Sequence, residues 1–326
     1  MNGTNRETRT NLFQSRNAGF YNAFIVLSVF NIFLAITAIL GNTLIFLALG
    51  RGSCLHPPSR LLIRSLAFTD LCVGLISQPL AALHAISILT KHLEIFQFTV
   101  VSSYVTSAVL SGVSLFVLTF ISIDRLLALS LGVRYRQTVT TKRVRTFVIF
   151  IWVVNIANAT FRFSGNRFLF YIVCLAGIFL CVVVSTYCYG KICRTLRLQS
   201  TKVLANVTEG QPNERSTLHV ERYKKTVSSA LWVHFTMLAC YLPFGVVSGV
   251  KAITGDILPV AEGFTATLIF FNSSVNPILY CWRIRKLRQA VKESIRRYCG
   301  FSSRVQSGRA VQVKKHLVNL DMQPCN

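Results

Sequence analysis

Residues 23–49 read AFIVLSVFNIFLAITAILGNTLIFLAL, an apolar run without a single charged side chain. About 20 residues of α-helix span the hydrocarbon core of a bilayer, so this run is long enough to cross it. A strand of a membrane barrel would instead alternate apolar and polar residues over about 10 positions. The stretch therefore predicts a transmembrane helix near the start of the chain.

Six further apolar segments follow the first one. The seven predicted spans cover residues 23–49, 62–89, 98–131, 146–164, 168–193, 226–250 and 258–281. Because the connections between spans are short, they leave no room for a second folded domain. We predict an all-α membrane protein with an outer tail (1–22), a seven-transmembrane helix bundle (23–298) ending in a short amphipathic eighth helix (about 283–298), and an inner tail (299–326).

Positive charges are distributed unevenly between the two sides of these spans. With the N-terminus outside, 28 of the 35 Lys and Arg residues fall on the inner side. Inner loops of membrane proteins carry an excess of Lys and Arg. The pattern therefore predicts a multi-pass membrane protein with the N-terminus outside and the C-terminus in the cytoplasm.

The composition argues against several other classes of protein. Hydrophobic residues make up 52% of the 326 positions and charged residues only 14%, whereas soluble domains average about 25% charged residues. The net charge of +24 would indicate nucleic-acid binding in a soluble chain. In a chain this apolar it favours a basic face against anionic lipid headgroups, so we expect membrane lipids and no nucleic acid as partners.

Charged side chains at membrane depth are rare and mark functional sites. Asp70 lies in the middle of the second span (LAFTDLCVG, 66–74), and Asp124 and Arg125 are adjacent at the inner end of the third (FISIDRLLAL, 120–129). No basic residue lies at the depth of Asp70, so its companions are expected to be amides, hydroxyls, water or a small cation. The candidates are Asn42, Ser114, Asn272, Ser273 and Asn276. The alternative is that Asp70 is a purely structural hydrogen-bonding hub.

These residues belong to a series of motifs that resembles the rhodopsin-like (class A) G-protein-coupled receptors over residues 23–298. In order along the chain, the motifs are GN (41–42), LAxxD (66–70), DR (124–125), Trp152, Tyr189, CYLP (240–243) and NPILY (276–280). Each motif is weak by itself, but all seven follow the family's order on the expected spans. Within the family, the pattern is nearest to the adenosine and melanocortin-type branch and fits no assigned receptor.

The resemblance implies roles by position. Asp70, Ser114, Asn272 and Asn276 match the family's sodium pocket, which makes Na⁺ the candidate allosteric ion and the only cofactor considered. A second group matches the residues used for G-protein coupling and activation: Asp124, Arg125, Tyr189, Tyr280, Pro243 and Pro277. In that group Asp124 holds Arg125 in the resting state, and the prolines kink their helices because they remove backbone hydrogen bonds.

The ligand pocket is described mostly by what it lacks. Ser107 stands where amine receptors carry an aspartate, which disfavours an amine ligand. The remaining pocket consists of Tyr104, Ser107, Ser111, Tyr241, Phe244 and Lys251. The residues near its mouth are His84, Arg162, Arg167 and Lys251. This neutral-to-basic mouth hints at an acidic or lipid-like ligand, and the alternative is that these are ordinary loop charges. The ligand stays unidentified: lipid-like, nucleoside-like or peptide.

Cysteines and modification motifs add three expectations. No cysteine falls in a predicted outer loop, and Val100 stands where the family has the span-three cysteine of its disulfide, so we expect no disulfide. Asn2 in the sequon NGT is the predicted glycosylation site. Cys299, just after a basic segment, is the candidate for palmitoylation, with an unmodified thiol as the alternative.

The segment 283–298 has the pattern of an amphipathic helix. Ile284, Leu287, Val291 and Ile295 recur at spacings of three and four, which places them on one helical face. Basic residues cover the flanks and the opposite side. The pattern predicts a helix lying in the inner membrane interface, and the alternative is a solvated basic tail.

The function expected from this pattern is a receptor that couples an extracellular ligand to a heterotrimeric G protein, with arrestin as a second candidate partner. The alternative is a seven-helix transporter or channel, a class that usually shows inverted repeats. An enzyme is not expected, because the HExxH and GxSxG motifs are absent and Asp70 has no second acid at its level.

Overall fold

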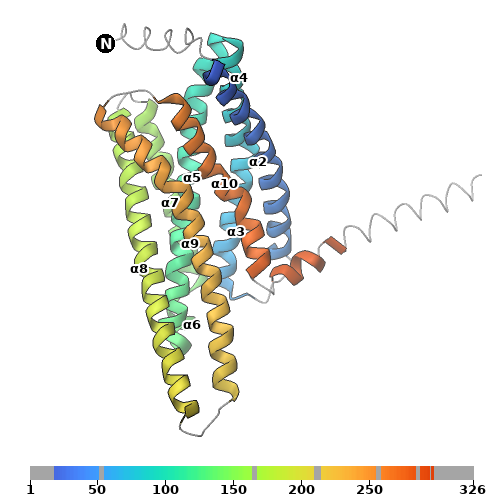
Figure 1. Cartoon of the computed structure of the whole chain (residues 1–326), viewed down its shortest axis with the longest axis vertical. Coiled ribbons are helices and arrows are strands. Elements are labelled where there is room, and N and C mark those ends of the chain that lie inside the picture. Colours follow the sequence, from blue (N-terminus) through green and yellow to red (C-terminus); the bar gives the residue numbers. More distant parts are fainter. Residues whose placement is uncertain are drawn as a thin grey trace, which may run out of the picture.

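The computed structural model describes residues 18–50, 55–163, 167–208, 214–254, 258–283, 287–293 and 295–296. The elements in these ranges are helices (Figure 1): α2 (Ala18–Gly50), α3 (Pro57–Cys72), η1 (Val73–Ser77), α4 (Gln78–Thr90), α5 (Leu93–Leu131), η2 (Gly132–Arg134), α6 (Tyr135–Thr138), α7 (Thr141–Phe163), α8 (Arg167–Thr208), α9 (Glu214–Thr254) and α10 (Pro259–Arg283). As in Figure 1, the upper end is where α2 begins and the lower end is where α2 finishes.

The helices form a closed seven-membered bundle, with α3, η1 and α4 acting as one continuous span. Six stretches of the described chain are long and apolar enough to cross a membrane. The remaining helix, α10, packs between α9 and α2 and closes the ring, while α5 contacts α3, α4, α7 and α8. The seven-helix bundle predicted from the apolar runs is confirmed.

Two helices, α8 and α9, extend much further past their apolar runs than the others do. The run ending at residue 193 continues as α8 to Thr208, and α9 begins at Glu214 although its apolar run starts at 226. A bilayer limits the length of an apolar run but not of a helix, which continues wherever its residues favour helix. Both helices therefore extend past their neighbours at the lower end (Figure 1).

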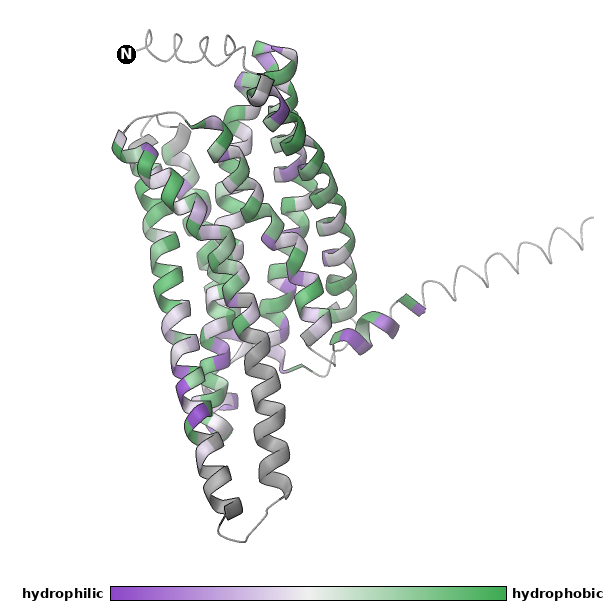
Figure 2. Ribbon diagram, viewed as in Figure 1, coloured by the Kyte–Doolittle hydropathy of each residue, from purple (hydrophilic) through white to green (hydrophobic). Residues whose placement is uncertain are grey.

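The outer surface of this bundle is apolar, unlike that of a soluble protein. Apolar residues of α2 face outward, where Val29 is 64% and Phe33 59% exposed, while the Asp70 side chain is 0% exposed. Figure 2 shows apolar residues along most of the bundle and more hydrophilic ones toward its lower end. The outward surface is suited to lipid, and the interior keeps the polar side chains away from it.

The second span contains a π-helical segment that begins at Val73, shortly after Asp70. Pro79 has no N–H to donate to the carbonyl one turn earlier, and the N–H of Gln78 bonds Val73 O, five residues back. The helix thereby widens over Val73–Ser77 before α4 continues as a regular α-helix. Pro243 and Pro277 lie inside α9 and α10, respectively.

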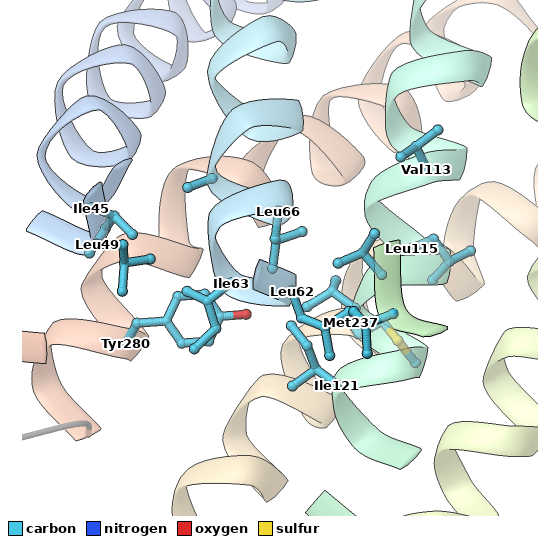
Figure 3. Packing of buried hydrophobic residues seen from close by; sticks show 14 of the residues in the cluster. Ile45, Leu49, Leu62, Ile63, Leu66, Val113, Leu115, Ile121, Met237 and Tyr280 are labelled. Carbon is cyan, nitrogen blue, oxygen red and sulfur yellow. The ribbon is translucent and has the colours of Figure 1, made fainter. Parts of the chain in front are cut away.

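A close approach holds α2 against α10 at mid-height. A Cβ placed on Gly41 would lie 2.9 Å from Cγ of Pro277. Only glycine therefore allows the two backbones to come this near. Figure 3 shows part of the main apolar cluster, which includes Ile45 and Leu49 of α2, Leu62 and Leu66 of α3, and Ile121 of α5.

Candidate functional site

The carboxylate of Asp70 accepts three hydrogen bonds in the middle of the bundle. Ser114 Oγ of α5 and Ser273 Oγ of α10 donate to Oδ1 at 3.0 and 2.8 Å, and Asn276 Nδ2 donates to Oδ2 at 2.8 Å. All four side chains are buried. Asp70 thus links the second, third and seventh spans through hydroxyl and amide partners, the chemistry expected of its companions.

Asn272 makes no side-chain hydrogen bond to Asp70. Both of its side-chain polar atoms are buried without a hydrogen-bond partner among the described residues, as is Oδ1 of Asn276. Asn42 instead approaches the hub from α2, where its Nδ2 donates to the backbone oxygen of Ser273 at 3.0 Å. The site therefore combines one carboxylate with two hydroxyl oxygens and with amide oxygens that still have lone pairs available.

At the lower end, Asp124 is bound by two hydroxyl groups. Tyr135 of α6 donates to its Oδ1 at 2.5 Å and Ser59 of α3 donates to its Oδ2 at 2.9 Å. The two hydroxyls lie 3.3 Å apart. Within the described residues no ion pair joins Asp124 to the neighbouring Arg125, which is half-buried. The resemblance implied that Asp124 holds Arg125; here the carboxylate is held by Ser59 and Tyr135.

Tyr189 and Tyr280 lie inside the lower half of the bundle. The Tyr189 hydroxyl accepts from Ser122 Oγ at 3.1 Å, and its ring lies 4.8 Å from the ring of His234 on α9. Tyr280 belongs to the main apolar cluster, and Figure 3 shows its ring near Ile63 and Leu49. Its buried hydroxyl has no hydrogen-bond partner in the described part of the chain.

Toward the upper end, the predicted pocket residues divide into two groups. The deeper group includes Tyr241 and Ser111, and the Tyr241 hydroxyl donates to the backbone oxygen of Ser111 at 3.1 Å. Ser107 and Phe244 are half-buried beside this level on α5 and α9.

The group nearer the upper end centres on Lys251. Its Nζ lies 2.5 Å from Oε1 of Glu262 on α10. The hydroxyl of Tyr104 donates to Oε2 of the same carboxylate. The Nζ also lies 5.6 Å from the ring centroids of both Tyr104 and Tyr171. The structure thereby brings Tyr104 and Lys251 together through a carboxylate that was absent from the predicted pocket.

Several predicted residues lie outside the described part. Asn2 and Cys299 are among them, and so are the side chains of Arg162 and Arg167. The seven cysteines that the structure does describe are free thiols. In the eighth-helix segment, the described residues 287–293 and 295–296 are helical. Leu287 and Val291 are buried in the main cluster and Ile295 is exposed.

Sequence reasoning missed Glu262, Tyr171 and Ser59 as site residues. Glu262 lies in the first turn of α10, and an acidic residue so near the end of a span gave no signal of an intramembrane charge. A partner search around Lys251 would have found it, because Lys251 is in the last turn of the preceding helix.

Comparisons with known proteins agree with this arrangement. A family model described as 7 transmembrane receptor (rhodopsin family) matches residues 41–167 and 160–280. The chain is 26% identical over 302 residues to the histamine H2 receptor of Rattus norvegicus, covering 86% of this chain and 81% of that receptor. It is 24% identical over 282 residues to the adenosine receptor A3 of Ovis aries, covering 79% of this chain and 86% of that receptor.

Proposed function

We infer the function from the family, because the chain belongs to the rhodopsin family of seven-transmembrane receptors. It is a G-protein-coupled receptor, a multi-pass protein of the plasma membrane and not an enzyme. This assignment replaces the alternative of a seven-helix transporter or channel. The orientation is part of our proposal: the upper end is extracellular and the lower end cytoplasmic, as the bias of Lys and Arg supports.

The proposed G-protein surface is the lower end around Arg125. The observation that carries this proposal is the binding of Asp124 by Ser59 and Tyr135. Because two hydroxyls satisfy that carboxylate, it does not hold the half-buried Arg125 guanidinium, which is left for a partner. The long lower ends of α8 and α9 extend past their neighbours at this same end (Figure 1). Arrestin is proposed as a second partner there.

The proposed ligand site is the upper half of the bundle, from Tyr241 up to Lys251. The charge of Lys251 no longer favours an acidic ligand, because Glu262 neutralises it. Two relatives are named as histamine and adenosine receptors, so small polar amines join lipids, nucleosides and peptides as classes to test.

A guanine-nucleotide exchange assay on the purified, reconstituted chain tests the proposal. We expect basal exchange on at least one member of a panel of G proteins and an increase with one ligand class. Arg125→Gln should abolish both. Lys91→Gln removes an exposed charge at the upper end and is the matched control. Exchange that persists in Arg125→Gln would contradict the assignment of the coupling surface.

The Asp70 site is proposed to bind sodium. Carboxylate and hydroxyl oxygens are the ligands that hard cations prefer, and the Oδ1 atoms of Asn272 and Asn276 are buried without hydrogen-bond partners in the described chain. Asp70, Ser114 and Ser273 would hold the ion, with Asn276 and Asn272 supplying amide oxygens. The bound ion would add a positive charge that favours the resting arrangement. Glycosylation of Asn2 and palmitoylation of Cys299 also stay proposals.

A further inference from the structure

Four helices meet around the ammonium group of Lys251 at the upper end of the bundle. Glu262 comes from α10, Tyr104 from α5, Tyr171 from α8 and Lys251 itself from α9. The ammonium lies 2.5 Å from a carboxylate oxygen and 5.6 Å from the centres of two aromatic rings. We call the three groups that surround it, Glu262, Tyr104 and Tyr171, the ammonium cage.

The cage has the chemistry of a site for organic cations. Aromatic rings within about 6 Å attract an ammonium group through the negative charge of the ring face, and the carboxylate adds a full opposite charge. Glu262 is fixed in place, since the Tyr104 hydroxyl donates to one of its oxygens and it sits in the first turn of α10. The positive end of the helix dipole stabilises a carboxylate there.

Lys251 is the part of this arrangement that can leave easily. It lies in the last turn of α9, where the negative end of the helix dipole favours a positive charge even without an ion-pair partner. Its side chain is still 23% exposed, against 13% for Glu262. A lysine has a long flexible stem, so its ammonium can move to water beyond the helix end.

We propose that the ammonium cage binds the alkylammonium group of a ligand, which displaces Lys251. The inference rests on the proposed function, because it names a ligand class for the upper-end pocket. The absence of an aspartate at Ser107 disfavoured amine ligands, but Glu262 supplies a carboxylate from α10 instead. A tethered lysine competes at a high effective concentration, so it weakens ligand binding in the wild-type chain.

Binding of choline to the full-length chain in lipid nanodiscs tests the proposal, with affinity measured from the shift of thermal unfolding against probe concentration. Lys251→Met vacates the cage and keeps a stem of similar length, so choline should bind about tenfold more tightly than to wild type. Lys91→Met, at an exposed upper-end lysine, is the matched control and should bind choline like wild type. The neutral isostere 3,3-dimethylbutan-1-ol and the anion butyrate should gain nothing.

Further variants identify the groups that bind the probe. Adding Glu262→Gln or Tyr171→Leu to Lys251→Met should remove the gain, whereas adding Tyr104→Phe keeps the ring and most of the affinity. If Lys251→Met does not fold, Lys251→Gln takes its place. Equal choline binding by wild type and the Lys251 variant, or a gain for butyrate instead, would overturn the inference. Because the readout is binding, a chain that binds choline but activates no G protein refutes the proposed function alone.

Discussion

At the scale of single residues, Asp70 determines what the centre of the bundle can bind. Three donors from two helices already point at its carboxylate. A serine hydroxyl that donates to a carboxylate can turn its lone pairs toward a cation, so the same side chains serve an empty and an occupied site. The charge of Asp70 is the one component that no neighbour replaces.

Asp70→Asn is therefore expected to abolish the response of the receptor to sodium. Wild-type basal exchange should be lower in NaCl than in KCl of equal concentration, because the ion favours the resting arrangement. The asparagine keeps the size and hydrogen-bonding capacity of the side chain but removes the charge that attracts the ion. An identical sodium response in wild type and variant would show that the pocket binds no ion.

A second prediction at this scale concerns Tyr135. Tyr135→Phe removes one of the two hydroxyls that bind Asp124 and makes the carboxylate available to Arg125. Hydrogen bonds to charged groups are worth about 1.5–3 kcal/mol, so basal nucleotide exchange should fall about tenfold. Tyr187→Phe, at a tyrosine that is 63% exposed, is the control. A rise in exchange would show that the Tyr135 hydroxyl restrains the receptor instead.

The partners of Asp70 were predictable by type but not individually. Asn272, Ser273 and Asn276 are neighbours on one helix, and sequence spacing cannot decide between Asn272 and Ser273 because the rotation of α10 about its axis is set by packing. Ser273 donates a hydrogen bond to Asp70 and Asn272 does not. Glu262 was missed for a related reason: its partners Tyr104 and Lys251 are on other helices.

At the scale of helices, the contact between Gly41 and Pro277 sets the distance between α2 and α10. Gly41→Ala would place a methyl group 2.9 Å from Cγ of the proline ring, which cannot rotate away. Such overpacking costs about 1–3 kcal/mol, so the melting temperature of the purified receptor should fall. Gly50→Ala, in the same helix with nothing within 4 Å, should leave it unchanged or raise it. Equal melting temperatures would contradict the close approach.

The eighth-helix segment packs on the bundle through Leu287, which is fully buried in the main cluster. Leu287→Ala should cost about 2–5 kcal/mol, as for other buried leucines. Ile295→Ala is the matched control, because Ile295 is 41% exposed in the same segment. Thermal unfolding compares the two. If both variants unfold like wild type, the segment is the solvated tail that its basic residues also allow.

At the scale of the whole molecule, no disulfide is expected to contribute to folding or ligand binding. The seven described cysteines are free thiols within helices, and none of the ten falls in a predicted outer loop. A membrane-impermeant reductant applied to intact cells should therefore leave surface expression and ligand binding unchanged. A loss of binding would mean that the cysteines or the spans are placed wrongly.

The sequence allowed the seven spans to be predicted because lipid imposes one requirement on each, a long apolar run. Helix ends that lie outside the membrane are not subject to this requirement. The predicted spans therefore stopped short of the lower ends of α8 and α9. The widening at Val73–Ser77 was also not predicted, since Pro79 is compatible with a kink, a break or a π-helical turn.

The π-helical segment has a consequence for comparing this receptor with its relatives. A π-helical turn holds one residue more than the α-helical turn it replaces. When this chain is aligned with a homologue whose helix is regular here, residues Gln78 to Thr90 are matched one position out of register. The register is restored only if a gap is opened within Val73–Ser77. At 24–26% identity, residue matching alone does not place such a gap. Position-by-position transfer of pocket residues on α4 therefore requires a structural superposition, whereas transfer to Asp70, which precedes the extra residue, does not.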